Sequence, residues 1–85
     1  MTKRLTSNLV RKLRFLNDEM TQKDLAKRAG VSRQTIVAVE KGDYTPSLEL
    51  AFKIAYVFGV PLEEVFKFHP ELIESKGKEN IWNQL

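Results

Sequence analysis

Apolar residues recur along this chain at the spacing of buried helical faces. From about Asn8 to Asp18, the leucines Leu9, Leu13 and Leu16 follow one another at intervals of four and three residues. This spacing predicts a first helix that buries its leucine face. A broader apolar stripe predicts a central packing helix that ends at Gly59, and it consists of Leu48, Ala51, Ile54, Ala55 and Phe58.

Capping residues delimit a second helix at about 21–29. Thr21 is a favourable N-cap and Asp24 follows it three residues later, a spacing typical of a capping box. Gly30 comes directly after the expected last turn, where a left-handed residue is needed to end a helix. The second helix is therefore expected to be short.

A third helix is expected at about 32–41, only a few residues after the second. Ser32 caps its start, Ile36 and Val39 form its inward face, and Gly42 ends it. The second and third helices are therefore expected to be joined by a connection of only a few residues.

The carboxyl-terminal half predicts one more helix and a short strand. Pro61 suits the first turn of a fifth helix, and the acidic residues Glu63 and Glu64 lie near its positive end. The alternating residues from Val65 to Phe68 then favour a short strand, because Pro70 prevents a smooth continuation of the helix.

Length and charge narrow the picture further. With 85 residues and no cysteine, the chain can build one compact domain, stabilised by packing rather than by disulfides or thiolate metal sites. Residues 1–45 contain ten Lys/Arg and five Asp/Glu, a net charge of +5, whereas residues 46–85 contain four and six, a net charge of −2. The basic half is therefore where a nucleic-acid partner is expected. Without an apolar signal segment or membrane span, we expect a cytoplasmic protein with no membrane contact.

The outward face of the third helix carries side chains that suit DNA recognition. Arg33 and Gln34 have planar groups that can hydrogen-bond in pairs to guanine and adenine edges, respectively. Val37 and Ala38 are small and apolar, so they permit close approach or contact with a thymine methyl group. The alternative from helical geometry alone is an ordinary solvated face.

Glu40 is expected to lie partly inward on the same helix, beside Ile36. A buried carboxylate requires a partner. Arg14, on the first helix, is the candidate, and such an ion pair would set the angle of the third helix. The alternative is that Glu40 reaches solvent.

The stretch MTQKDLAKRAGVSRQTIVAVEKG, Met20 to Gly42, resembles the helix-turn-helix of the phage-repressor and Cro-like (XRE-type) transcriptional regulators. The continuation GDYTPSLELAFKIAYVFGVPLEEVFKF, which ends at Phe68, is similar to a compact subgroup that includes the enterococcal cytolysin repressor. Together the resemblance covers residues 8–68. It implies an all-α, five-helix, lambda-repressor-like domain, with a minor two-stranded β element from the termini. It also implies a repressor that binds a palindromic operator in double-stranded DNA as a homodimer.

The resemblance implies DNA-contacting roles for particular residues. Arg33, Gln34 and Val37 match base-contacting positions, and Gln22 matches a glutamine that holds a phosphate at the start of the second helix. Other positions match or neighbour the sugar-phosphate backbone, and these are Lys23, Ser32, Thr35, Lys41, Tyr44 and Thr45.

Two further positions follow from the resemblance. The segment Asn17–Glu19 is one residue longer than the usual pattern, so Arg14 aligns with the family's first-helix arginine only across a gap, and Phe15 takes the ungapped position. Phe66 and Phe68 match the strand through which members of the subgroup dimerise. For these two phenylalanines the alternative is simple closure of the core.

The sequence divides into a DNA-binding domain, 1–68, and a carboxyl-terminal tail, 69–85. The tail contains Leu72, Ile73, Ile81, Trp82 and Leu85, which can dock on the domain, extend a dimer contact or bind another protein. The rival function is therefore an antitoxin-like or other protein-interaction module whose DNA binding depends on a partner. Binding of RNA is disfavoured, because no aromatic platform interleaves with the basic residues.

Nothing in the sequence favours catalysis. The single histidine, His69, has no evident catalytic partner, and Glu63 and Glu64 diverge on a helix because they are adjacent. No metal-ligand spacing or phosphate-binding glycine loop is present. We therefore expect no catalytic residues, no metal and no cofactor.

Overall fold

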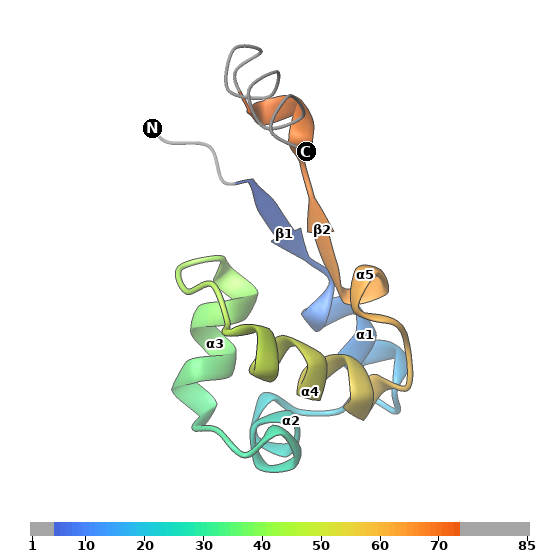
Figure 1. The fold of residues 1–85 in the computed structure, drawn as a ribbon. Helices are drawn as coiled ribbons and strands as arrows, with labels where there is room; N and C mark the ends of the chain where they lie inside the picture. The colour runs from blue at the N-terminus through green and yellow to red at the C-terminus, as the bar shows by residue number, and fades with distance from the viewer. Residues whose placement is uncertain (1–4, 74–85) are drawn as a thin grey trace.

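The computed structural model describes residues 5–73. This part of the chain is mostly helical, with five α-helices and one two-stranded sheet (Figure 1). The elements are β1 (Thr6–Asn8), α1 (Val10–Leu16), α2 (Gln22–Ala29), α3 (Arg33–Lys41), α4 (Leu48–Phe58), α5 (Leu62–Val65), β2 (Phe66–Phe68) and the 3₁₀ turn η1 (Pro70–Leu72). The predicted five-helix architecture and its minor β element are therefore confirmed.

The helix-turn-helix is bounded by the caps that the sequence predicts. The Thr21 hydroxyl accepts the backbone N–H of Asp24 at 2.9 Å, and the Asp24 carboxylate accepts the N–H of Thr21. Ser32 caps α3 by accepting the N–H of Thr35 at 3.2 Å. Gly30 and Gly42 end the two helices with φ of 74° and 80°, a left-handed conformation that glycine adopts without steric cost.

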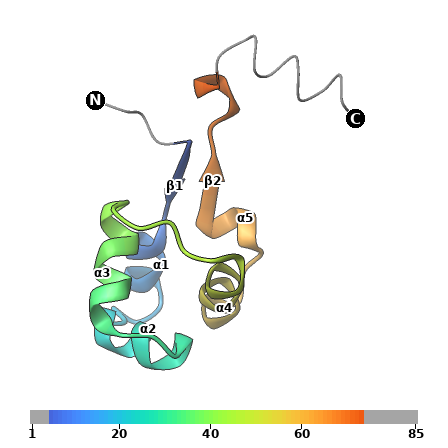
Figure 2. The same cartoon turned by 60° about the vertical axis from the view of Figure 1, so that its left-hand side comes forward.

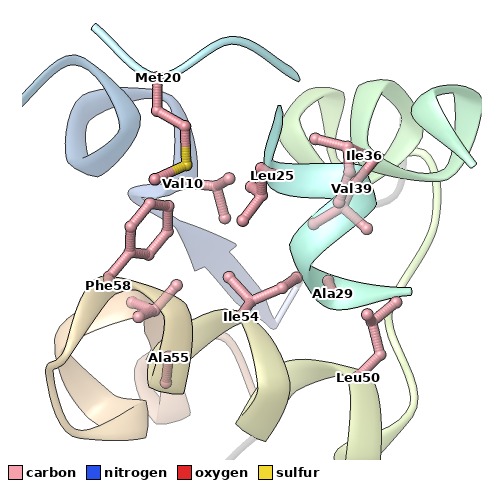
Figure 3. Packing of buried hydrophobic residues seen from close by; sticks show 12 residues of the cluster. Val10, Met20, Leu25, Ala29, Ile36, Val39, Leu50, Ile54, Ala55 and Phe58 are labelled. Atoms are coloured by element: carbon pink, nitrogen blue, oxygen red, sulfur yellow. The ribbon is translucent and has the colours of Figure 1, made fainter. Parts of the chain in front are cut away.

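One apolar core holds the helices together. Side chains from α1, α2, α3 and α4 point toward one another in Figure 3. Leu25, Ile36 and Ile54 are completely buried, one each from α2, α3 and α4. Burial of this kind supplies most of the stability of a domain that has no disulfide. The core therefore fixes how α3 is presented to solvent.

The structure corrects the predicted first helix in both length and orientation. Asn8 belongs to β1, where it pairs with Phe66, and the helix ends at Leu16, so that Asp18 lies outside it with a φ of 54°. Of the predicted face, Leu13 is confirmed because it packs against the core, whereas Leu16 is wrong because it is 69% exposed. Val10, which the predicted face omits, is fully buried. The buried side of α1 instead combines the apolar Val10 and Leu13 with two half-buried polar residues, Arg14 and Asn17.

The apolar stripe of α4 is correct except at its first residue. Leu48 is 67% exposed, whereas Leu50, which the predicted stripe omits, is buried. The two residues lie about 200° apart on a helix, so only one of them can face the core. Leu50 shares the core face with Ile54 and Phe58.

The two strands form an antiparallel ribbon that extends away from the helices (Figure 1). Thr6 pairs with Phe68 and Asn8 pairs with Phe66, so both phenylalanines lie on the same face of the ribbon. Phe66, near the helices, packs against the core, while Phe68 is 58% exposed. The predicted alternative of core closure thus describes Phe66 and does not describe Phe68.

The tail predicted for residues 69–85 is described only in part. His69 receives a hydrogen bond from Ser7 or donates one to it, and Pro70–Leu72 form η1. Ile81, Trp82 and Leu85 lie outside the described residues. Within residues 5–73, no helix is long and apolar enough to cross a bilayer.

Candidate nucleic-acid interface

The outward side of α3 presents the predicted base-contacting residues to solvent. Arg33 and Gln34 are exposed in the first turn, and Val37 and Ala38 are half-buried in the next. Ile36 and Val39 are buried on the opposite side of the helix. The core thus holds α3 from behind and leaves its polar first turn accessible.

A hollow of about 640 Å³ lies between α3 and the start of α2. It brings together five of the predicted DNA-contacting residues, which are Gln22, Lys23, Arg33, Val37 and Lys41. Lys23, Arg33 and Lys41 are exposed, and none of them forms an ion pair with a carboxylate of residues 5–73. Glu19 adds one exposed carboxylate to the lining, so the exposed charges around the hollow are mainly cationic, which suits a polyanionic ligand.

The predicted ion pair between Arg14 and Glu40 forms the floor of this hollow. Arg14 donates Nε to Glu40 Oε2 at 2.6 Å and Nη2 to Oε1 at 3.1 Å. The two side chains are only 16% and 8% exposed. Arg14 Nη1 also donates to the carbonyl of Met20 at 2.8 Å, so one guanidinium fixes the start of the helix-turn-helix and the end of α3.

Hydrogen bonds connect the ion pair to two of the predicted DNA-contacting residues, Gln22 and Arg33. Gln22 Nε2 donates to Glu40 Oε1 at 3.2 Å, and Arg33 Nη2 donates to Gln22 Oε1 at 3.3 Å. Arg14, Glu40, Gln22 and Arg33 thus form one polar chain that runs from a nearly buried pair to an exposed guanidinium. Sequence reasoning predicts each of these residues but not the contact between Gln22 and Arg33, which depends on the angle between α2 and α3.

Other predicted residues lie elsewhere on the surface. Tyr44 and Thr45 follow α3 and line a different hollow, next to β1. The hydroxyls of Ser32 and Thr35 are hydrogen-bonded to each other at 3.0 Å at the start of α3, and neither residue lines the hollow. The structure therefore does not bring these four residues into the hollow that contains Arg33.

Two residues of α1 that the sequence does not single out as DNA contacts also line the hollow between α2 and α3. Arg11 and Phe15, one helical turn apart, lie on its α1 side. The spacing of four residues is visible in the sequence, but the proximity of α1 to α3 is not. The residues missed from sequence are thus those whose position depends on tertiary packing.

The Ser32 cap carries a testable consequence for the recognition surface. Replacing Ser32 with alanine should lower the free energy of unfolding by about 1 kcal/mol, because the N–H of Thr35 loses its acceptor. Ser32→Asn keeps a capping oxygen and should lose only a few tenths of a kcal/mol. Urea unfolding followed by circular dichroism measures both values. Equal losses in the two variants would remove the capping role.

Comparison with known proteins places the chain in a family. The profile of the helix-turn-helix family HTH_3 matches residues 11–65. An uncharacterized HTH-type transcriptional regulator of Methanocaldococcus jannaschii is 62% identical over 52 residues, which cover 61% of this chain and 79% of that protein. The transcriptional repressor RstR of the cryptic phage CTXphi of Vibrio cholerae is 36% identical over 75 residues, which cover 88% of this chain and 67% of the repressor.

A solved structure supports the fold independently. The crystal structure of the hypothetical transcription factor NHTF from Neisseria matches with a TM-score of 0.57 and 22% sequence identity, over 87% of this chain and 79% of that chain. This likeness concerns the fold, while the sequence matches establish the family. The chain belongs to the HTH_3 helix-turn-helix family and is a DNA-binding, XRE-type transcriptional regulator without enzymatic activity.

Proposed function

We propose that the protein represses transcription by occupying a palindromic operator as a homodimer, in the manner of the compact subgroup that includes the cytolysin repressor. Its DNA-binding domain is residues 1–68, and residues 69–85 are a tail that contacts the dimer partner or another protein. Repression is supported by the similarity to RstR, which is named as a transcriptional repressor. A dimer bound at the operator would hinder polymerase directly.

The observation that carries this proposal is the meeting of Gln22, Arg33 and Lys41 in one basic hollow. Arg33 uses one N–H on Gln22, so most of its five N–H donors remain available to the two acceptors of a guanine. Gln22 gives one amide hydrogen to Glu40 and keeps the other for a phosphate oxygen. Base contact and phosphate contact would thus be made by adjacent side chains.

The remaining contacts follow the surface of α3. Gln34, Val37 and Ala38 would lie toward base edges in the major groove. Backbone contacts would come from α2, from the start of α3 and from the loop after it, through Lys23, Ser32, Thr35, Tyr44 and Thr45. The phosphate contacts would set the register, and the base contacts would supply specificity.

Arg33→Ala tests the assigned base contact. The variant should weaken binding to the preferred sequence by about 1–3 kcal/mol, and it should affect a scrambled duplex less. The measurement is fluorescence anisotropy on a duplex selected from a random library by the wild-type protein, beside a scrambled duplex of equal composition. Arg28→Ala is the matched control, because Arg28 is exposed on α2 but does not line the hollow.

The outcomes separate the proposal from its rival. Equal losses on both duplexes would remove Arg33 from base recognition. If the wild-type protein showed no preference between the duplexes at any salt concentration, operator binding by the protein alone would be contradicted. The antitoxin-like alternative, in which a partner is required, would then be favoured.

A further inference from the structure

We infer that α1 forms a third wall of the DNA-binding surface, with Arg11 contacting a backbone phosphate and Phe15 packing against the adjacent deoxyribose. This inference rests on the proposed function, and it extends the contacts beyond the helix-turn-helix itself. It concerns the α1 side of the hollow, where Arg11 and Phe15 lie.

The position of α1 carries the first step. Arg11 and Phe15 line the same hollow as Gln22, Arg33 and Lys41. Figure 2 shows α1, α2 and α3 together on one side of the molecule, with α4 and α5 on the other. The Arg14–Glu40 pair ties α1 to α3 at the floor of the hollow. A DNA strand that reached Arg33 would therefore pass beside the outer face of α1.

Charge carries the second step. Arg11 is exposed and forms no ion pair with a carboxylate of residues 5–73. Together with Lys23, Arg33 and Lys41 it places a cation on each of the three helices around the hollow. Arg14 does not add to this charge, because Glu40 neutralises it. The Arg11 guanidinium on α1 is suited to contact a phosphate, because a guanidinium forms paired hydrogen bonds with phosphate oxygens.

The exposed ring of Phe15 carries the third step. Phe15 is 67% exposed although it lies in a hollow with a charged rim. An exposed aromatic side chain gains free energy when an apolar surface covers it. Along the DNA backbone, the apolar surface next to each phosphate is the deoxyribose. Arg11 and Phe15 are four residues apart and so lie on the same side of α1, as neighbouring phosphate and sugar contacts require.

Alanine variants of α1 test the inference. Arg11→Ala should reduce the slope of log affinity against log salt by about 1 and weaken binding on the order of tenfold, equally on the selected and scrambled duplexes. Arg11→Lys should restore much of the slope. Phe15→Ala should weaken binding severalfold without changing the slope, because it removes no charge.

Lys12→Ala is the matched control, because Lys12 is exposed on α1 but does not line this hollow. It loses the same charge as Arg11→Ala and should change the slope far less. The inference is overturned if the two variants have equal slopes and affinities. In that case Arg33→Ala can still reduce the preference for the selected duplex, so failure of this inference is distinguishable from failure of the proposed function.

Discussion

Replacing Glu40 with alanine should lower the free energy of unfolding by about 3–5 kcal/mol. The substitution leaves the Arg14 guanidinium, whose side chain is 16% exposed, without its carboxylate partner. Removing one member of a nearly buried pair is costly because the other charge stays desolvated and uncompensated. The free energy of unfolding of a small domain is only about 5–15 kcal/mol. This single substitution should therefore remove a large part of it.

Urea unfolding at fixed protein concentration measures this effect, and two further variants identify its cause. The double replacement Arg14→Met with Glu40→Leu should be far more stable than Glu40→Ala, because it removes both charges and fills their space. Lys53→Ala breaks an ion pair in which both side chains are mostly exposed, so it should cost less than about 1 kcal/mol. A Glu40→Ala loss as small as that of Lys53→Ala would show that the pair contributes little.

The same carboxylate links stability to DNA binding. Glu40 accepts the amide of Gln22, and Gln22 in turn accepts a hydrogen bond from Arg33. The orientation of the proposed phosphate-contacting and base-contacting side chains therefore depends on a nearly buried group that DNA does not need to touch. This arrangement makes Glu40 a positioning residue for Gln22 and, through Gln22, for Arg33.

The helix-turn-helix could be predicted closely because its boundaries are local. A hydroxyl at the N-cap accepts an N–H three residues later, and a glycine in the left-handed conformation directly follows the last helical residue. Thr21, Ser32, Gly30 and Gly42 act in the structure as these rules predict. No tertiary information is required for such signals.

The orientation of α1 could not be predicted because its buried side is half polar. Arg14 and Asn17 lie on that side, where Asn17 Nδ2 donates to the carbonyl of Leu13 and Arg14 binds Glu40. A prediction based on apolar residues alone does not place polar side chains on a buried face. It therefore chose the leucine face, which includes the exposed Leu16. The length of α1 also depended on a distant partner, since Asn8 pairs with Phe66 in the ribbon.

In the candidate site, too, the residues set by local sequence could be predicted and those set by tertiary packing could not. Residues of α2 and α3 could be identified from helix periodicity and from the family resemblance, because both signals lie within one continuous segment. Arg11 and Phe15 could not, because their place beside Arg33 depends on how α1 packs across the core. The sequence places Phe15 at the ungapped first-helix position of the family, but nothing in it indicates that Phe15 or Arg11 lies beside Arg33.

Phe68→Glu should abolish the proposed homodimer and weaken binding to a palindromic operator by about 100- to 10,000-fold, through loss of the second linked half-site. Phe68 lies on the core-facing side of the ribbon but beyond the helices, which leaves it 58% exposed. Leu72, in η1 just after β2, is 37% exposed. A second copy that covered this end of the ribbon would bury apolar surface that is otherwise exposed to water.

Tyr56→Glu is the matched control for this prediction, because Tyr56 is an 87% exposed aromatic residue on α4 and its substitution changes the net charge equally. Analytical ultracentrifugation should find the Phe68 variant monomeric and the Tyr56 variant dimeric. On a single half-site the two variants should bind alike, because neither change alters α3.

The high affinity for the whole operator would then come from two-fold symmetry, because only a dimer can bind two half-sites about 34 Å apart at the same time. Full operator affinity of a monomeric Phe68 variant would contradict binding as a homodimer, and a dimeric Phe68 variant would place the interface elsewhere.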